Sequence, residues 1–369
     1  MQPWSDDILG WLALYMIPGL GNNSFNALLK RFGSPQAVFE ADLSDLLDVR
    51  EIRKDVAHNI IRKKFVKDPE AELRKVERLG ARIITFRDPS YPPLLREIHY
   101  PPMLLYVRGK DIPDELMLIA MVGSRNATPY GLKTAEKIAF SLAKSGVGTV
   151  SGLAKGIDAA AHTGSIRGGG FTIAVTGTGI DIVYPATNRK LLDQVVETGA
   201  VISEFPLGTP PEPKNFPIRN RIISGLSRGV AVIEATRKSG SLITAAFALD
   251  QGREVFAVPG SIESFKSKGT HFLIKEGARL IENANDILDE FGLGDRQAGK
   301  NGIKGTDPVP PAGMTRPEKE VYELIGEYPV HIDQIVRDSQ MDAGEILSIL
   351  MRMELRGLVR QLPGKMFVR

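Results

Sequence analysis

The sequence predicts an α/β protein built on a doubly wound parallel β-sheet, with a helical module before the sheet and a module of three helices and a β-hairpin after it. Apolar segments of strand length alternate with helical segments in the middle of the chain, and Gly-rich turns join strands to the helices that follow. The chain has 369 residues, more than one ordinary domain contains. We therefore expect domains over 1–65, 66–292 and 313–369, with a flexible linker over 293–312.

The first 65 residues have helical periodicity. Apolar residues recur at helical spacing over 11–15, 25–32 and 38–47, and a Gly19-Leu20-Gly21 turn separates the first two runs. Two short helices joined by such a turn resemble a helix-hairpin-helix (SAM-like) unit. Backbone N–H groups of the turn could bind a phosphate, or the glycines could serve only the geometry of the turn, and the short motif favours the second interpretation.

Eight segments are expected to be strands. Two precede the main α/β repeat, at 82–86 and 103–107, and we expect the second to join the sheet; Asp68-Pro69 begins a helix before them. The others are 118–122, 148–151, 171–176, 200–204, 229–234 and 254–258. The segment 118–122 is apolar throughout, which is typical of a parallel strand covered by helices on both faces.

Composition limits the classes of function. Cysteine is absent, which excludes disulfides, thiolate nucleophiles and Cys-ligated zinc, and fits a reducing, cytoplasmic location. No apolar run reaches the length of a membrane span, and the N-terminus does not resemble a signal peptide. The net charge of +3 is too small to indicate nucleic-acid binding by itself.

The ends of the predicted strands indicate an anion site. In an open parallel sheet, ligands bind outside the carboxyl ends of the strands. Those ends carry Gly-rich turns that lead into helix N-termini, at 123–125, 152–156, 177–179 and 239–241. Backbone N–H groups in such turns bind phosphate, and the extent of the set over several strands suggests a polyanion or a nucleotide.

The stretch from Glu204 to Ser224 adds cations and an aromatic ring to this edge. It begins as a Pro-rich loop and continues as a helix. Between 203 and 270 there are nine Lys or Arg residues and six Asp or Glu, an excess equal to that of the whole chain. Cations, amides and an aromatic ring together suit a phosphate chain that carries bases, although the arginines could also pair with carboxylates of the protein.

Signals of catalysis or of a bound cofactor are weak. The glycines do not form the G-x-G-x-x-G fingerprint, no Walker lysine motif occurs, and we expect no cofactor and no metal. Ser151, Asp158 and His162 could be arranged as a triad, but no nucleophile elbow is present. We expect Asp158 to cap a helix N-terminus or to interact with the helix dipole, and His162 to be a buried polar group with a structural role. Glu204 and Glu234 end strands and remain acid candidates.

The motifs of the central domain, taken in order, resemble the DNA processing protein A (DprA/Smf) family. They are Met121 to Arg125, Ser151 to His162, Gly177 to Pro185, Ser203 to Pro206, Phe216 to Ser224 and Ser239 to Ala245. The resemblance covers the central domain in full and implies an extended Rossmann fold. It implies a single-stranded DNA-binding protein, without catalytic turnover, that protects incoming DNA during natural transformation and loads RecA on it.

The resemblance also implies particular site residues and partners. The DNA-binding residues would be Gly123, Ser124, Arg125, Lys155, Gly156, Lys214, Asn215, Phe216, Arg219, Asn220 and Arg221. The protein would form a homodimer through the end of the sheet domain, with His271, Ile274 and Leu280 in the interface, although periodicity alone makes Ile274 and Leu280 ordinary core. Partners would be single-stranded DNA and RecA, with single-strand binding protein as a further one, and no membrane.

The last 56 residues have the pattern of a winged-helix domain, three helices followed by a hairpin over 357–369. Asp342 and Glu345 come early in the third helix, where they would repel phosphate, whereas Arg352, Arg356 and Arg360 lie near its end and in the wing. Charge leaves contact with protein and weak contact with DNA equally open. A sequence-specific regulator is disfavoured on the same ground.

An enzyme is the alternative function. The same fold resembles nucleotide-processing phosphoribohydrolases, whose Gly-rich loops and acidic residues act on a mononucleotide. Such an enzyme requires a glutamate-rich catalytic loop, whereas the loop before Arg219 supplies cations and an aromatic ring. The sequence therefore favours binding of a DNA strand.

Overall fold

The computed structural model describes residues 6–294, 314–325, 330–339, 341–362 and 364–368. The chain divides into two compact units, residues 1–292 and 293–369. The predicted linker over 293–312 lies outside the described residues except for its first two. No helix in the described ranges is long and apolar enough to span a membrane.

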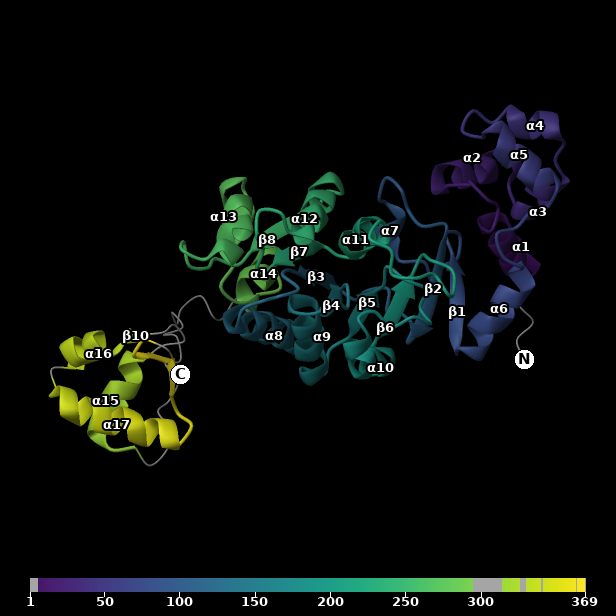
Figure 1. Ribbon diagram of the computed structural model, residues 1–369. Helices are drawn as coiled ribbons and strands as arrows, with labels where there is room; N and C mark the ends of the chain where they lie inside the picture. The colour runs from purple at the N-terminus through teal and green to yellow at the C-terminus, as the bar shows by residue number, and fades with distance from the viewer. Residues whose placement is uncertain (1–5, 295–313, 326–329, 340, 363, 369) are drawn as a thin grey trace. The chain divides into compact units, whose positions relative to one another are not determined.

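A nine-stranded sheet is the centre of the first unit (Figure 1). Its strands are β1 (Ala81–Thr85), β2 (Leu104–Gly109), β3 (Leu118–Val122), β4 (Gly148–Ser151), β5 (Thr172–Val175), β6 (Ala200–Ser203), β7 (Gly229–Val232), β8 (Glu254–Ala257) and β9 (Arg279–Leu280). Their spatial order is β1-β2-β6-β5-β4-β3-β7-β8-β9. The seven strands from β6 to β9 in this order are parallel, as predicted, whereas β1 and β2 form an antiparallel edge beside β6.

Helices cover both faces of the sheet, as expected for a doubly wound fold (Figure 1). One face carries α8 (Pro129–Lys144), α9 (Ile157–Arg167), α10 (Arg189–Thr198) and α14 (Ala284–Glu290), and the other carries α11 (Asn215–Gly225), α12 (Gly240–Asp250) and α13 (Lys268–Lys275). Successive side chains of β3 point to opposite faces of the sheet and enter the two hydrophobic cores that lie on those faces. Ile119 and Met121 pack with α8, whereas Ala120 and Val122 pack with α11 and α12.

Six helices form the N-terminal part of the first unit. They are α1 (Asp6–Tyr15), α2 (Asn22–Phe32), α3 (Pro35–Glu40), α4 (Leu43–Leu47), α5 (Lys54–Ile61) and α6 (Pro69–Arg78). Trp11 stacks on Phe25 with ring centroids 5.4 Å apart, and the same core continues to Tyr106 and Val201 on the sheet. The single helical run predicted over 38–47 is two helices, because the backbone at Ala41 is extended.

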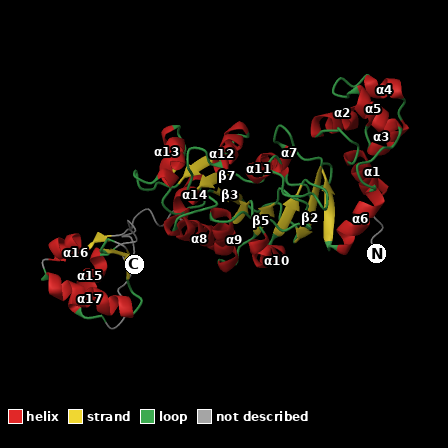
Figure 2. Cartoon of the chain, in the orientation of Figure 1, coloured by secondary structure: helices red, strands yellow, loops and turns green. Residues whose placement is uncertain are grey.

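The second unit has the predicted winged-helix architecture (Figure 2). Helices α15 (Arg316–Leu324), α16 (Ile332–Ser339) and α17 (Ala343–Leu355) precede a hairpin of β11 (Arg360–Leu362) and β12 (Met366–Val368). A short strand that the sequence did not indicate, β10 (Val330–His331), pairs with β12.

Candidate nucleic-acid interface

A pocket lies where the order of the strands reverses. β3 and β7 are neighbours, yet the chain runs from β3 to β4 on one side and reaches β7 only after β6. The turns after β3 and β7 line a cavity of about 270 Å³, which we call the switch-point pocket. Its lining includes six of the predicted site residues, Gly123, Ser124, Arg125, Phe216, Arg219 and Asn220. Parallel sheets bind ligands at this kind of position.

A second pocket adjoins the first on the other side of Phe216. It has a volume of about 290 Å³ and is lined by Tyr184 and Pro185 together with Arg125, Lys155, Phe216 and Arg219. We call it the Tyr184 pocket. Arg125, Phe216 and Arg219 line both pockets, so the two cavities lie next to each other. Arg125 and Lys155 are exposed, so their charges are available to an anion.

Arg219 forms the floor between the pockets. Its guanidinium donates to Gly152 O at 2.7 Å and to Val175 O, the carbonyls at the carboxyl ends of β4 and β5. The residue is only 4% exposed, and burial lowers its pKa to about 10, so it stays protonated at neutral pH. Arg219 therefore connects α11 to the sheet, and its charge contributes to the site from beneath the surface.

Asp158 supports the loop that carries Lys155. Its carboxylate accepts hydrogen bonds from Gly152 N at 3.1 Å and Ala154 N at 3.4 Å. Burial raises the pKa of Asp158, and the neighbouring Arg219 opposes that rise. Asp158 thus holds the β4–α9 turn from the first turn of α9, where a carboxylate faces the helix dipole. The N-cap position is Gly156, so Asp158 does not cap the helix.

Gly156 is required by close packing of two rim loops. Its φ of +77° is in the left-handed region, and a Cβ there would lie 2.2 Å from Ser124 O. Any side chain would push the β4–α9 turn away from the Ser124–Arg125 turn. Gly156 therefore keeps Lys155 and Arg125 together, although it lies in neither pocket lining.

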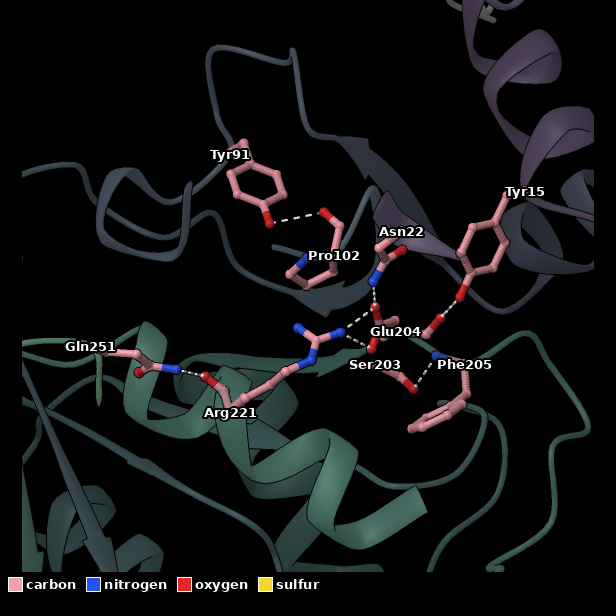
Figure 3. A network of polar contacts seen from close by, with 9 residues as sticks. All are labelled: Tyr15, Asn22, Tyr91, Pro102, Ser203, Glu204, Phe205, Arg221 and Gln251. Atoms are coloured by element: carbon pink, nitrogen blue, oxygen red, sulfur yellow. Dashed lines mark hydrogen bonds and ion pairs between the residues drawn. The ribbon is translucent and has the colours of Figure 1, made fainter. Parts of the chain in front are cut away.

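Arg221 has a different contact from the one the sequence predicts. Its Nη2 binds both carboxylate oxygens of Glu204, at 2.5 and 2.6 Å, and it lines neither pocket (Figure 3). Glu204 also accepts hydrogen bonds from the N-terminal helices, through Asn22 Nδ2 at 2.7 Å and, at its backbone carbonyl, Tyr15 Oη at 2.6 Å. Burial raises the pKa of Tyr15, so its phenol stays protonated as the donor. The Glu204–Arg221 pair therefore joins α11 to the helical domain.

Two further predicted residues lie outside both pocket linings. Lys214 is exposed and forms an ion pair with Glu212 at 2.8 Å, whereas Asn215 is buried and donates to Pro210 O at 3.5 Å. Both hold the Pro-rich loop at the start of α11. An anion could still reach Lys214, since its partner is also at the surface.

The catalytic candidates have structural contacts. Ser151 Oγ donates to Met121 O at 2.6 Å, and His162 Nδ1 lies 2.7 Å from Thr172 Oγ1, so neither contacts the other or Asp158 as a triad would. Glu234 accepts hydrogen bonds from Thr128 at the start of α8. Within the described residues, no group of three His, Asp or Glu side chains is placed to hold a metal.

His162 should make stability pH-dependent. Burial lowers its pKa from 6.5 to about 3. Between these values the unfolded chain binds a proton that the folded chain does not, so stability falls as pH falls, by about 1.4 kcal/mol per pH unit. We expect urea midpoints to fall less steeply over this window in His162→Asn than in wild type. Asp158 titrates in both proteins, so the difference isolates His162, and parallel curves would contradict its burial as a neutral group.

The predicted dimer residues lie at the β8–β9 edge of the sheet. Leu280 on β9 is 46% exposed, Ile274 on α13 is half-buried, and His271 Nε2 lies 3.0 Å from Gly260 O. Ile274 packs against the core under α11 and α12. Leu280 is thus the more exposed of the two apolar residues.

Acidic residues are prominent in the winged-helix unit. Asp342 caps α17 by accepting from Gly344 N at 2.8 Å, and Glu345 is exposed on its first turn. Glu318 forms ion pairs with Arg352 at 3.4 Å and Arg356 at 3.6 Å. Two of the cations that could meet DNA therefore have carboxylate partners within the domain.

Comparison with known proteins identifies the family. The family model described as DNA recombination-mediator protein A matches residues 82–292. The chain belongs to this family. Models of the DprA winged helix domain and of the SAM-like helix-hairpin-helix tandem match residues 305–365 and 12–63.

Relatives of this family cover the chain to different extents. Protein Smf of Synechocystis is 36% identical over 97% of this chain and 98% of its own. The X-ray structure of DNA processing protein A from Streptococcus pneumoniae has a TM-score of 0.68 and 38% identity, over 76% of this chain and 97% of that one. A structure of DNA processing protein A from Helicobacter pylori, described for its single-stranded DNA binding mode, has a TM-score of 0.51 and 28% identity, over 57% and 95%.

Tyr184 is a site residue that reasoning from the sequence missed. It lies in the loop after β5, and its ring centroid is 5.7 Å from that of Phe216. The signal was present in the Gly177 to Pro185 motif, but nothing local shows that this loop meets α11. Only the packing of the two segments places a second aromatic ring at the site.

Proposed function

We propose that the protein binds single-stranded DNA along the switch-point pocket and the Tyr184 pocket. The observation that carries this proposal is the arrangement around Phe216, where the exposed cations Arg125 and Lys155 lie beside aromatic rings. Cations track the phosphates of a single strand, and aromatic rings accept its bases without reading sequence. The single-stranded DNA binding described for the Helicobacter pylori relative supports the same ligand.

The proposed biological role is that of a recombination mediator without catalytic turnover. In this role the protein protects incoming DNA and loads RecA on it during natural transformation. It would work in the cytoplasm as a homodimer, with RecA and single-strand binding protein as protein partners. The family's description as a recombination-mediator protein supports the role, and exposed Leu280 is compatible with a dimer contact.

The rival function, hydrolysis of a mononucleotide, has little support from the acidic residues. Glu204 is in an ion pair with Arg221, and Glu234 is bonded to Thr128. Neither carboxylate lines the switch-point pocket or the Tyr184 pocket. A hydrolase on this fold needs a carboxylate facing its substrate, and Asp158, the one acid in these linings, is held by two backbone N–H groups.

A gel-shift titration tests the proposal directly. The full-length protein is titrated against a single-stranded oligonucleotide and its duplex, with and without an excess of mononucleotide. We expect a shift of the single strand at lower protein concentration than of the duplex, and little competition by the mononucleotide. Equal affinity for both forms would contradict the proposal, and full competition together with release of free base would favour the rival.

Arg125→Ala and Lys155→Ala should each weaken single-strand binding and reduce its dependence on salt. Each phosphate contact contributes about 0.7 to the slope of log K against log salt, because binding releases condensed counterions. We expect each variant to lose about that much, measured by fluorescence anisotropy over a salt series. The control is Lys144→Ala. Lys144 is the last residue of α8, at the amino ends of the strands and away from both pockets. An unchanged slope in both site variants would contradict the assignment.

A further inference from the structure

The ring of Phe216 is largely covered by other groups of the protein. Arg125 Cζ lies 5.2 Å from the Phe216 ring centroid and Arg219 Cζ lies 5.9 Å from it. Tyr184 lies against the same ring, and a Cβ on Gly177 would be 2.9 Å from Phe216 Cδ1. The Phe216 ring is therefore half-buried, and the groups around it leave little of its surface for a base to stack on.

Tyr184 has the exposure that Phe216 lacks. Its side chain is 44% exposed, although it lies beside Phe216 at an interplanar angle of 36°. It lines the Tyr184 pocket together with Lys155 and Arg125, the two exposed cations. A base that stacks on Tyr184 would thus leave its phosphates within reach of both cations.

The loop that carries Tyr184 is held in place before any ligand arrives. Asn188 Nδ2 donates to Leu153 O at 2.9 Å and to Ala154 O at 3.3 Å, which ties the loop to the turn of Lys155. Thr178 Oγ1 donates to Ile182 O at 2.9 Å within the loop. An aromatic ring on a fixed loop loses little conformational entropy when a base stacks on it.

We propose that Tyr184 is the surface on which an unpaired base of the bound strand stacks, and that Phe216 positions Arg125 and Tyr184 around the pocket. This rests on the proposed function. Bases of a duplex are already stacked on their neighbours and cannot lie on Tyr184 without unpairing. Tyr184 is therefore a specificity residue that favours single strands over duplex, while Arg125 and Lys155 attract either form through phosphate.

The test compares Tyr184→Leu with Tyr184→Phe, because leucine keeps apolar bulk and phenylalanine keeps the ring. A single-stranded oligonucleotide with one 2-aminopurine and its duplex are the probes. We expect Tyr184→Leu to bind the single strand about 10-fold more weakly, the size of one base–aromatic stack, with an unchanged salt slope. Duplex affinity should stay the same, and the fluorescence quenching that stacking causes should be reduced. Tyr184→Phe should behave as wild type.

Two controls separate stacking on Tyr184 from a general effect of losing an aromatic ring. Tyr100→Leu removes another exposed aromatic ring, 47% exposed, outside both pockets, and should bind as wild type. Phe216→Leu should weaken binding less than Tyr184→Leu, and the reverse order would overturn the proposal. Wild-type affinity in Tyr184→Leu, or a Tyr184→Phe variant as weak as Tyr184→Leu, would also overturn it. If the wild-type protein itself does not prefer the single strand, the proposed function fails instead.

Discussion

Glu204→Ala should destabilise the protein by about 3–5 kcal/mol, because it leaves the buried Arg221 guanidinium without its counter-charge. The side chains of Arg221 and Glu204 are 10% and 6% exposed, and Nη1 of Arg221 already has no hydrogen-bond partner among the described residues. The change also removes the acceptor of Asn22. We expect a lower urea midpoint, with the N-terminal helices losing their attachment to α11.

Two variants make this prediction specific. Glu204→Gln keeps oxygen and volume but loses the charge, so its midpoint should lie between those of wild type and Glu204→Ala. Glu97→Ala breaks a comparable contact at the surface, where Glu97 is 64% exposed and 3.5 Å from Arg253, and should cost less than about 1 kcal/mol. If Glu204→Ala costs no more than Glu97→Ala, the pair contributes nothing to the docking of the helical domain.

Arg219→Met should weaken single-strand binding by at least about 10-fold while keeping the salt slope of wild type. Arg219 is buried and bonded to carbonyl groups, so it does not contribute a released counterion as Arg125 does. Its loss removes the floor of both pockets and a contact of Phe216. It also leaves buried carbonyls without donors, each at a cost of about 1–3 kcal/mol, so the urea midpoint should fall as well.

The control for this variant is Arg228→Met, which removes an exposed cation just before β7, at the amino edge of the strands. It should leave both affinity and stability near wild type. Anisotropy titrations over a salt series separate the two roles of arginine at the site. A reduced slope in Arg219→Met would show that Arg219 contacts phosphate directly, contrary to its bonds with Gly152 and Val175.

Much of the site was predictable because its parts are local in the chain. The turns after β3 and β4 each contain glycine and a cation, and the parallel fold places such turns at the carboxyl ends of the strands. Arg125 and Lys155 could therefore be assigned to a common rim from sequence alone. The strands β1 and β2 were predicted, but their antiparallel pairing and the short β10 strand were not, since strand pairing leaves no periodic signal in the sequence.

The alternation of strands and helices, the Gly-rich turns and the choice of α11 as the cationic element all follow from the order of residues in the chain. That order could not distinguish Arg219 from Arg221. Two residues apart on a helix, their side chains point about 200° apart, so only one can reach the pockets. Packing between distant segments gives the two arginines different roles. Arg221 forms an ion pair with Glu204 where α11 meets the helical domain, whereas carbonyl groups at the ends of β4 and β5 bind Arg219 beneath the site. The same packing brings Tyr184 beside Phe216, because contacts between loops depend on the whole fold and not on local spacing.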